Sequence, residues 1–239
     1  MSLSGFKVLS FDVVGTLIDF ERVILYSVCA TAGSAAASLD DDTILEAYRI
    51  ARALPGAGWF PDDLARVYLA MAPMLGLPVE SGAAEHLRDS VERWPAFPDS
   101  AEALKRLGAR YRLVAMTNAQ RWAARHFTQT LGDPFDAVIT VDDVGLEKPD
   151  PHFFSFALGR ISAWDFAMSD TLHVAQSQYH DIGVAREMGY TVCWIERRKG
   201  KKGYGGTKEP PRFTTPDYHF STLAELADAV DRDLAEAVA

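Results

Sequence analysis

Four apolar runs of this chain each end in polar side chains whose types could do chemistry together. The runs cover residues 7–11, 111–116, 137–141 and 171–175, and the polar residues after them are Asp12, then Thr117 and Asn118, then Lys148, then Ser177 to Asp181. Asp12 alone could simply cap the turn that Gly15 and Thr16 mark. Together, the four sets supply a carboxylate nucleophile, a cation, substrate-binding groups and a second carboxylate that can act on water.

The apolar runs are typical of buried strands, and helical patterns alternate with them. Helices are expected over 100–107, 119–131, 151–160, 179–188 and 222–230, with further strands over 190–195 and, as a short edge strand, 217–220. Strands that alternate with helices pair in parallel and are covered on both faces. The predicted fold class is therefore α/β, with a doubly wound parallel sheet whose strand ends bring the polar residues to one crevice.

Residues 20–94 have a different pattern, with four helical segments and no convincing strand. These segments cover 21–37, 43–54, 61–75 and 83–92. The first strand still needs the later strands to pair with, so the simplest topology inserts the helices between them. We therefore expect an α/β core domain of residues 1–19 and 95–239, and a helical cap domain of residues 20–94 above the crevice.

Composition narrows the class of partner. Hydrophobic residues make up 48% of the chain and charged residues 24%, as in an ordinary globular protein. The net charge of −9 argues against nucleic acid or an anionic membrane as a partner, but allows a small anionic substrate held by a few local cations. No apolar stretch approaches the ~20 residues of a membrane span, and no signal peptide is visible.

The two cysteines, Cys29 and Cys193, lie far apart in the sequence. They suggest neither a disulfide framework nor a zinc site, and Cys193 in the run TVCWI reads as a core residue. The expected compartment is the cytoplasm. We also expect Asp99 to cap the helix over 100–107, and the basic, glycine-rich segment 197–212 to be a mobile, solvated loop.

Four motifs carry a family resemblance: FDVVGTLID, MTNAQ, GLEKPDPHFF and HVAQSQYHDIGVA. In this order and spacing, the chain resembles the haloacid dehalogenase-like hydrolase superfamily over nearly its whole length. WPAFPDSAEAL and HVAQSQYHDIG are particularly similar to the type II 2-haloacid dehalogenase branch. The resemblance implies a parallel sheet with a helical cap inserted after the first motif.

One departure separates the branches of this superfamily. Its phosphatases carry a second aspartate two residues after the nucleophile, and they bind Mg²⁺ through the nucleophile and an acid in the last motif. This chain has Val14 at the first position and Gln176 where the last motif begins. A halide leaving group needs no proton, so the loss of the acid matters little to a dehalogenase. We therefore expect no metal and no cofactor.

The resemblance implies a two-step reaction. Asp12 attacks the halogen-bearing carbon of a short 2-haloacid, which releases halide and forms an ester. Water then hydrolyses the ester at the Asp12 carboxyl carbon, giving a 2-hydroxy acid. Lys148 would keep Asp12 ionised, Thr16 would support it by hydrogen bonding, and Asp181 would orient Lys148 or activate the water.

Substrate-binding residues are expected on both sides of the crevice. By resemblance, Thr117 and Asn118 bind the substrate carboxylate and help to hold the halide. Ser177 and Gln178, in the last motif, are further candidates, and Arg49 of the cap is the nearest match to the arginine that cradles the halide in family dehalogenases. Arg52, one turn further on, is its alternative. Family resemblance also makes a homodimer reasonable.

Rival interpretations remain at this stage. Asp12 could act on phosphate esters in a phosphatase-like hydrolase, the one case that would call for Mg²⁺. The chain could also be an inactive binding module of the same fold. Individually, Lys148 could be a solvated loop lysine and Asp181 an acid in the first turn of a helix. His180 reads as a packing or hydrogen-bonding residue.

Overall fold

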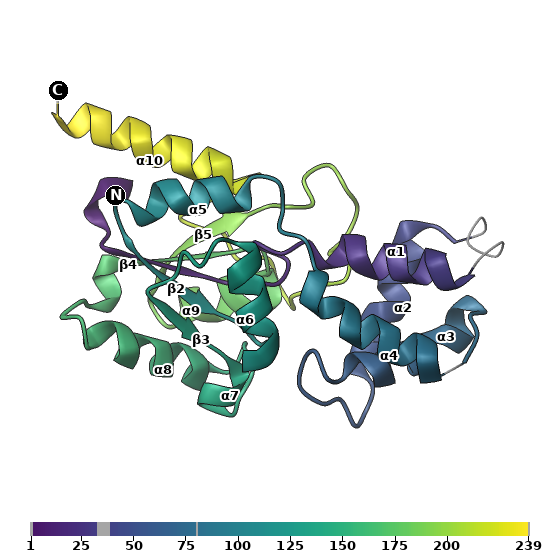
Figure 1. Cartoon of the computed structure of the whole chain (residues 1–239). Helices are drawn as coiled ribbons and strands as arrows, with labels where there is room; N and C mark the ends of the chain where they lie inside the picture. The colour runs from purple at the N-terminus through teal and green to yellow at the C-terminus, as the bar shows by residue number, and fades with distance from the viewer. Residues whose placement is uncertain (1, 33–38, 80, 239) are drawn as a thin grey trace.

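The computed structural model describes residues 2–32, 39–79 and 81–238. Its strands form one sheet in the order β3-β2-β1-β4-β5-β6, and every neighbouring pair is parallel. The strands are β1 (Val8–Phe11), β2 (Arg112–Met116), β3 (Ala137–Ile139), β4 (Thr171–Ala175), β5 (Thr191–Ile195) and β6 (Tyr218–Phe220). The predicted doubly wound α/β sheet is confirmed, with β6 as the expected edge strand (Figure 1).

Helices follow the strands as predicted, with small differences at their ends. They are α5 (Ser100–Gly108), α6 (Arg121–Thr130), α7 (Val141–Val144), α8 (Pro151–Ser162), α9 (Gly183–Glu187) and α10 (Leu223–Val238). The short α7 was not predicted, and the helix expected over 179–188 begins with a π-helical turn, Gln178–Ile182. Turns of 3₁₀-helix lie at Leu3–Gly5, Ser90–Arg93 and Met168–Asp170.

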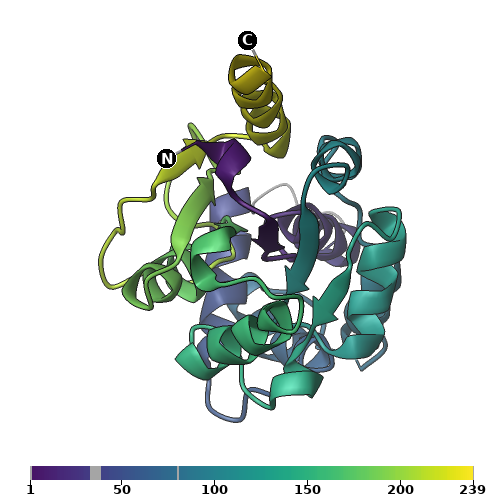
Figure 2. The same ribbon diagram turned by 90° about the vertical axis from the view of Figure 1, so that its left-hand side faces the viewer.

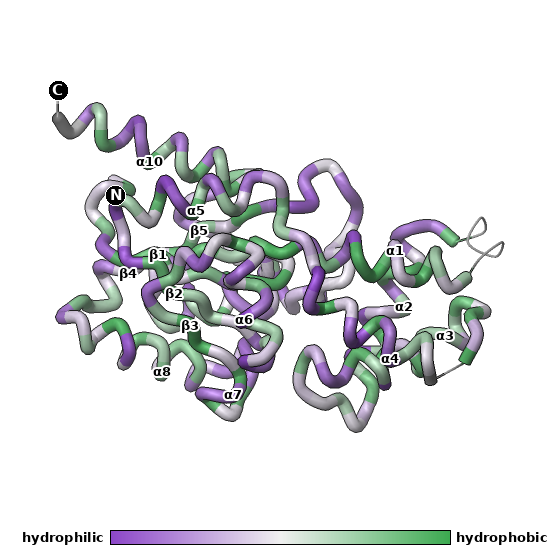
Figure 3. The backbone as a smooth tube through the Cα atoms, viewed as in Figure 1, coloured by the Kyte–Doolittle hydropathy of each residue, from purple (hydrophilic) through white to green (hydrophobic). Residues whose placement is uncertain are grey.

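The two faces of the sheet are buried by different helices, because alternate side chains of a strand point to opposite faces. In β1, Leu9 and Phe11 pack in the same apolar cluster as residues of α5 and α10. Val8 packs in the other cluster, with residues of α8 and α9. In Figure 2, α5 and α10 lie above the strands and α8 lies below them. Figure 3 shows apolar and polar segments alternating along α10, as expected of a helix with one buried face.

A block of four helices lies beside this sheet in Figure 1. They are α1 (Phe20–Ala32), α2 (Asp41–Ala53), α3 (Leu64–Leu75) and α4 (Ser81–Asp89). The end of the helix expected over 21–37 lies outside the described residues, and α3 begins at Leu64 rather than at residue 61. The two segments that connect the sheet to the helical block run side by side, since Phe97 N–H donates to Leu17 O at 2.9 Å. The domain limits 19/20 and 94/95 stay a prediction.

The strand order reverses between β1 and β4. The chain passes from β1 to β2 and β3 on one side, then returns to β4, β5 and β6 on the other. Such a switch point leaves a crevice at the carboxyl ends of the two central strands. Asp12 directly follows β1 at this point, so the fold places it at the bottom of the crevice.

Asp99 occupies the N-cap position of α5, as predicted, but its side chain caps a different helix. It accepts hydrogen bonds from the N–H groups of Leu223, at 2.6 Å, and Ala224, at 3.2 Å, at the start of α10. It also forms an ion pair with Arg197 at 2.8 Å. The long sequence separation of these partners hides the contact from local patterns.

The prediction of a solvated loop over 197–212 holds for residues 199–203, which are exposed, but is wrong for the two arginines at its start. Arg197 and Arg198 are largely buried, and Arg198 pairs with Glu21 of α1 at 2.6 Å. Arg197 Nε also donates to Thr16 O at 2.9 Å, which ties the loop to the turn after β1. This segment is therefore a wall between the sheet and the helical block. Among the described residues, no helix combines the length and the apolar character needed to cross a membrane.

Candidate active site

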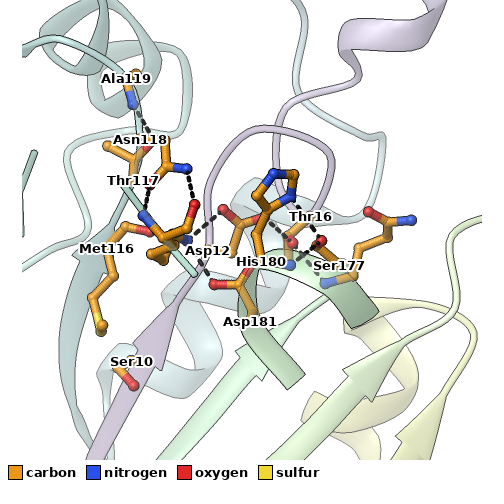
Figure 4. Close-up of polar contacts among 12 residues, drawn as sticks. Ser10, Asp12, Thr16, Met116, Thr117, Asn118, Ala119, Ser177, His180 and Asp181 are labelled. Carbon is orange, nitrogen blue, oxygen red and sulfur yellow. Dashed lines mark hydrogen bonds and ion pairs between the residues drawn. The ribbon is translucent and has the colours of Figure 1, made fainter. Parts of the chain in front are cut away.

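Asp12 lies at the carboxyl end of β1 with its carboxylate almost out of water. The residue is 7% exposed, and its Oδ2 atom accepts a hydrogen bond from Thr16 Oγ1 at 2.6 Å. Thr16 Oγ1 in turn accepts from Gln176 N–H, at 2.8 Å, after β4. Between them Gly15 has φ +94°, a conformation that glycine adopts without strain. The turn therefore folds Thr16 back onto Asp12, as predicted (Figure 4).

Lys148 is a buried lysine with all three of its ammonium hydrogens in use. Its Nζ atom lies 2.9 Å from Asp12 Oδ1, 2.6 Å from Asp181 Oδ1 and 2.7 Å from Met116 O. The side chain is 1% exposed. Lys148 is therefore not a solvated loop residue, and the structure brings it together with both predicted carboxylates.

Asn118 binds the backbone of Lys148 through both ends of its amide. Asn118 Nδ2 donates to Lys148 O at 2.9 Å, and Asn118 Oδ1 accepts from Lys148 N–H at 2.7 Å. Thr117 beside it is 1% exposed, and its Oγ1 atom accepts from Ala119 N–H at 3.1 Å, which leaves the hydroxyl hydrogen free to donate. Thr117 can thus donate to a substrate, whereas Asn118 holds the lysine.

Asp181 is buried, and its two carboxylate oxygens differ in their hydrogen-bond partners. Oδ1 accepts from Lys148 at 2.6 Å and lies 3.2 Å from Nε2 of His173. Oδ2 is buried and has no hydrogen-bond partner among the described residues. An ionised carboxylate accepts hydrogen bonds at both oxygens, so Oδ2 is a free acceptor at the site, as is Glu147 Oε1 in the cavity wall.

Two carboxylates share one ammonium here, and their pKa values move apart. Burial raises the pKa of Asp12, and the nearby Asp181 adds to this against the opposing charge of Lys148. Burial also acts on Asp181, but Lys148 and the hydrogen bond from His173 outweigh it and lower the pKa of Asp181 to about 2. Burial opposes the charge of Lys148, yet the two carboxylates raise its pKa. Asp181 is thus the more firmly ionised carboxylate.

A cavity of about 640 Å³ opens above these groups, between the sheet and the helical block. It is lined by predicted residues from both parts, namely Asp12, Arg49, Thr117, Asn118, Lys148, Ser177 and Asp181. Gln178 is not among the lining residues: its Oε1 atom accepts from Thr214 N–H at 3.0 Å, beside another hollow. The structure therefore does not bring Gln178, which lies in the π-helical turn, to this cavity, and its role in substrate binding stays a prediction.

The two arginines of α2 both line the cavity but differ in their partners. Arg49 Nη1 donates to the carbonyl of Gly205 at 3.0 Å. Arg52 forms an ion pair with Asp63 at 2.5 Å. In the part of the chain that the structure describes, Arg49 has no carboxylate within ion-pair distance. Among the described residues that line the cavity, Arg49 therefore carries an uncompensated positive charge, as does Lys208, whose ammonium binds the Tyr179 hydroxyl.

Ser177 and His180 bind each other at the edge of the cavity. Ser177 Oγ accepts from His180 N–H at 2.9 Å and lies 3.0 Å from His180 Nδ1. Burial lowers the pKa of His180 to about 4, so its ring is neutral at neutral pH. The expectation that His180 is a hydrogen-bonding residue is met by these contacts (Figure 4).

Sequence reasoning missed the wall that residues 206–209 add to the cavity. Gly206 N–H donates to Glu21 Oε1 at 2.9 Å, and Lys208 Nζ donates to the Tyr179 hydroxyl at 2.9 Å. A side chain at Gly206 would lie 2.7 Å from the ring of Phe20. In the sequence, the glycines of this segment indicated a flexible loop. In the structure, Gly206 is instead a position where the backbone approaches the ring of Phe20 too closely for a side chain.

The site does not fit a magnesium ion. A hard cation needs several free oxygen ligands in an open arrangement. Here Lys148 Nζ lies between Asp12 Oδ1 and Asp181 Oδ1, the two carboxylates that would bind it. Val14 lines the cavity where a phosphatase has its second aspartate. The ammonium group of Lys148 therefore occupies the place that a metal ion would need.

Comparison with known proteins identifies the family. A model of haloacid dehalogenase-like hydrolases matches residues 6–189. The chain belongs to this family. It is 28% identical to an (S)-2-haloacid dehalogenase of Pseudomonas putida over 196 residues, which cover 80% of this chain and 84% of that protein. It is 27% identical to haloacetate dehalogenase H-2 of Moraxella sp. (strain B), covering 88% and 93% of the two chains.

Among solved structures, the fold matches L-2-haloacid dehalogenase from Xanthobacter autotrophicus with chloropropionic acid covalently bound. The TM-score is 0.68 at 23% identity, over 95% of this chain and 98% of that chain. These relatives confirm the resemblance to the 2-haloacid dehalogenase branch, and the protein is a hydrolase of this family.

Proposed function

We propose that this hydrolase cleaves the carbon–halogen bond of 2-haloacids without a metal ion. The observation that carries the proposal is the Asp12 carboxylate, held by Thr16 on one oxygen and by Lys148 on the other. The presence of Val14 in place of a second acid supports a leaving group that needs no proton. The relatives named as 2-haloacid dehalogenases agree with this substrate class.

In the first step, a carboxylate oxygen of Asp12 attacks the carbon that carries the halogen. The carbon–halogen bond breaks as the carbon–oxygen bond forms, and halide leaves with the bonding electron pair. Burial raises the pKa of Asp12 because it removes water from the carboxylate, and a less solvated carboxylate is a more reactive nucleophile. Lys148 and Thr16 fix its direction of approach.

In the second step, water attacks Cγ of the Asp12 ester. Asp181 accepts the proton of that water through Oδ2, its oxygen without a partner. The bond between Cγ and the substrate oxygen then breaks, and Asp181 returns its proton to the departing oxygen. The 2-hydroxy acid leaves, the Asp12 carboxylate is restored with one oxygen from water, and the second proton of that water is released to solvent. Lys148 stabilises the negative charge that develops on the ester oxygen.

Arg49 and Thr117 are the groups we assign to the substrate. Arg49 carries an uncompensated charge at the cavity, which suits the departing halide. Thr117 has a hydroxyl hydrogen free to donate to the substrate carboxylate. We assign Ser177 an indirect role, because its hydroxyl is engaged with His180.

Chloride release from 2-chloropropionate, measured with and without EDTA, tests the proposal. We expect release at equal rates in both conditions, and loss of release in Asp12→Asn. Release that requires added Mg²⁺, or hydrolysis of phosphate esters alone, would contradict the proposal and favour the phosphatase-like alternative. Arg49→Ala should reduce kcat/KM more than Arg52→Lys, because Arg52 can keep its contact with Asp63 as a lysine.

A further inference from the structure

A polar pair lies buried in the apolar layer beneath the active site. Ser10 of β1 and His173 of β4 are opposite each other in the sheet, and both are 0% exposed. Ser10 Oγ lies 2.9 Å from His173 Nδ1, and His173 Nε2 lies 3.2 Å from Asp181 Oδ1. The ring of Phe154 in α8 packs edge-on against the imidazole, with centroids 5.3 Å apart. The pair forms a chain that ends on a catalytic carboxylate.

The chemistry of the three groups fixes the direction of the hydrogen bonds. The Asp181 carboxylate is ionised and can only accept, so His173 Nε2 carries a hydrogen and donates it. In the tautomer that carries its ring hydrogen on Nε2, Nδ1 is an acceptor, and it receives the hydroxyl hydrogen of Ser10. Every polar atom of the imidazole is satisfied in this arrangement. Asp181 is the titratable side chain hydrogen-bonded to His173, and Lys148 lies beyond it.

Packing alone does not account for two polar residues in this layer. Their neighbours on this face of the sheet are apolar, for example Val8, Val114 and Val192. Polar groups buried among such residues cost free energy unless they are hydrogen-bonded, and apolar side chains would fill the same space without that requirement. The contact that distinguishes His173 from its neighbours is the one to Asp181.

We propose that His173, held by Ser10, is a positioning residue for the water-activating step of the reaction. It binds Asp181 Oδ1 together with Lys148, and so fixes the carboxylate with Oδ2 left to the attacking water. This inference rests on the proposed two-step function. His173 keeps its proton throughout: water gives one proton to Asp181 Oδ2, and Asp181 passes it to the departing substrate oxygen as the Cγ–O bond breaks. The second proton of the water is released to solvent.

The proposal separates the two steps of the reaction. Formation of the ester needs Asp12, Lys148 and the substrate, but not a correctly aimed Asp181 Oδ2. Hydrolysis of the ester does need it. Loss of His173 should therefore slow hydrolysis selectively, so that the ester on Asp12 accumulates.

The experiment mixes enzyme with excess 2-chloropropionate and follows both chloride release and the mass of the Asp12 peptide. In His173→Leu we expect a rapid release of one chloride per chain, an accumulated adduct, and steady turnover reduced by about ten- to a hundredfold. His173→Gln should recover most of that loss, since its amide can donate to Asp181 from the position of Nε2. Ser10→Ala should show a smaller effect in the same direction, and it tests the chain if His173→Leu does not fold.

Val192→Ala is the matched control, because Val192 lies beside His173 on β5 in the same apolar layer. It loosens packing without touching the hydrogen bonds, so it should leave turnover near the wild-type value and give no adduct. The proposal is overturned if Val192→Ala and His173→Leu lower turnover alike, or if His173→Leu slows the first chloride release as much as steady turnover. A different result would reject the proposed function itself. If the wild-type enzyme releases chloride at its normal rate but no variant accumulates an adduct on the Asp12 peptide, Asp12 is not the nucleophile, and this inference fails with it.

Discussion

Asn118 and Lys148 are joined by two hydrogen bonds that run in opposite directions. The amide of Asn118 donates to Lys148 O at 2.9 Å and accepts from Lys148 N–H at 2.7 Å. Asn118 follows β2 and Lys148 lies in the loop between α7 and α8, so the pair ties together two segments of the site. This clamp sets the backbone from which the lysine reaches both Asp12 and Asp181.

Removal of the clamp should impair chemistry more than binding. In Asn118→Ala, Lys148 loses the partner that fixes its backbone, and a small displacement of the ammonium weakens its hold on Asp12. We expect kcat to fall by about ten- to a hundredfold, with KM changed by much less. Steady-state kinetics measures this, with exposed Gln129→Ala on α6 as the control. A change confined to KM would show that Asn118 binds substrate instead.

Activity should fall on the acid side as Asp12 takes up a proton. Burial and Asp181 raise the pKa of Asp12 above the ordinary aspartate value of 3.8, while Asp181 itself titrates near 2. The acid limb of kcat/KM should therefore have an apparent pKa above 3.8. Thr16→Val removes a hydrogen bond that lowers the pKa of Asp12, so it should move this limb to higher pH. A limb that moves to lower pH would contradict the assignment.

The two carboxylates should have opposite effects on stability. The folded-state pKa of Asp181, about 2, lies below the value of ~3.9 in unfolded chains, so its ionised form stabilises the fold above about pH 4. This contribution, about 2 kcal/mol at neutral pH, is lost as pH falls toward 2. The raised pKa of Asp12 has the reverse sign, and its ionised form costs stability at neutral pH.

Urea unfolding at neutral pH tests these signs with two matched amide variants. Asp181→Asn should lower the free energy of unfolding by about 2 kcal/mol. Asp12→Asn should leave it unchanged or raise it. Equal losses in both variants would mean that Lys148 depends on the two carboxylates equally.

The loop wall of the cavity can be tested with two glycines of similar conformation. Gly205 has φ +58° and Gly203 has φ +61°. A Cβ at Gly205 would lie 1.9 Å from Glu21 Oε1, whereas a Cβ at Gly203 meets nothing within 4 Å. Both alanine variants carry the left-handed strain, about 1 kcal/mol.

Gly205→Ala should in addition displace the segment that lines the cavity, and with it the carbonyl that Arg49 binds. We expect a several-fold higher KM in Gly205→Ala and a KM near the wild-type value in Gly203→Ala. Indistinguishable KM values for the two variants would show that the wall does not contribute to the substrate site.

The sheet and its central residues could be predicted from sequence because their signals are local. Apolar runs mark the strands, and parallel strands bring their carboxyl ends to one edge. Asp12, Lys148 and Asp181 therefore meet where their positions after the strands indicate. The absence of a second acid could also be predicted from sequence, because Val14 lies in the same turn as Asp12 and its position is therefore fixed relative to the nucleophile.

Features that depend on distant partners could not be predicted in this way. The side chain of Asp99 caps a helix far along the chain, and the largely buried Arg198 pairs with Glu21 and Asp42, which are distant in sequence. Gln178 lies in a π-helical turn, which the periodicity of the sequence does not predict. His173 did leave a signal, a histidine inside the apolar run TLHVA, but its meaning required the position of Asp181.

A single turnover in water enriched in oxygen-18 tests the central claim most directly. Enzyme in excess over 2-chloropropionate converts each substrate once, and the Asp12 peptide and the 2-hydroxy acid are then weighed by mass spectrometry. If water attacks Cγ of an Asp12 ester, the heavy oxygen enters the carboxylate of Asp12 and the first product carries none. Heavy oxygen in the first product, with an unlabelled Asp12, would mean that water attacks the substrate carbon directly and that Asp12 is not the nucleophile.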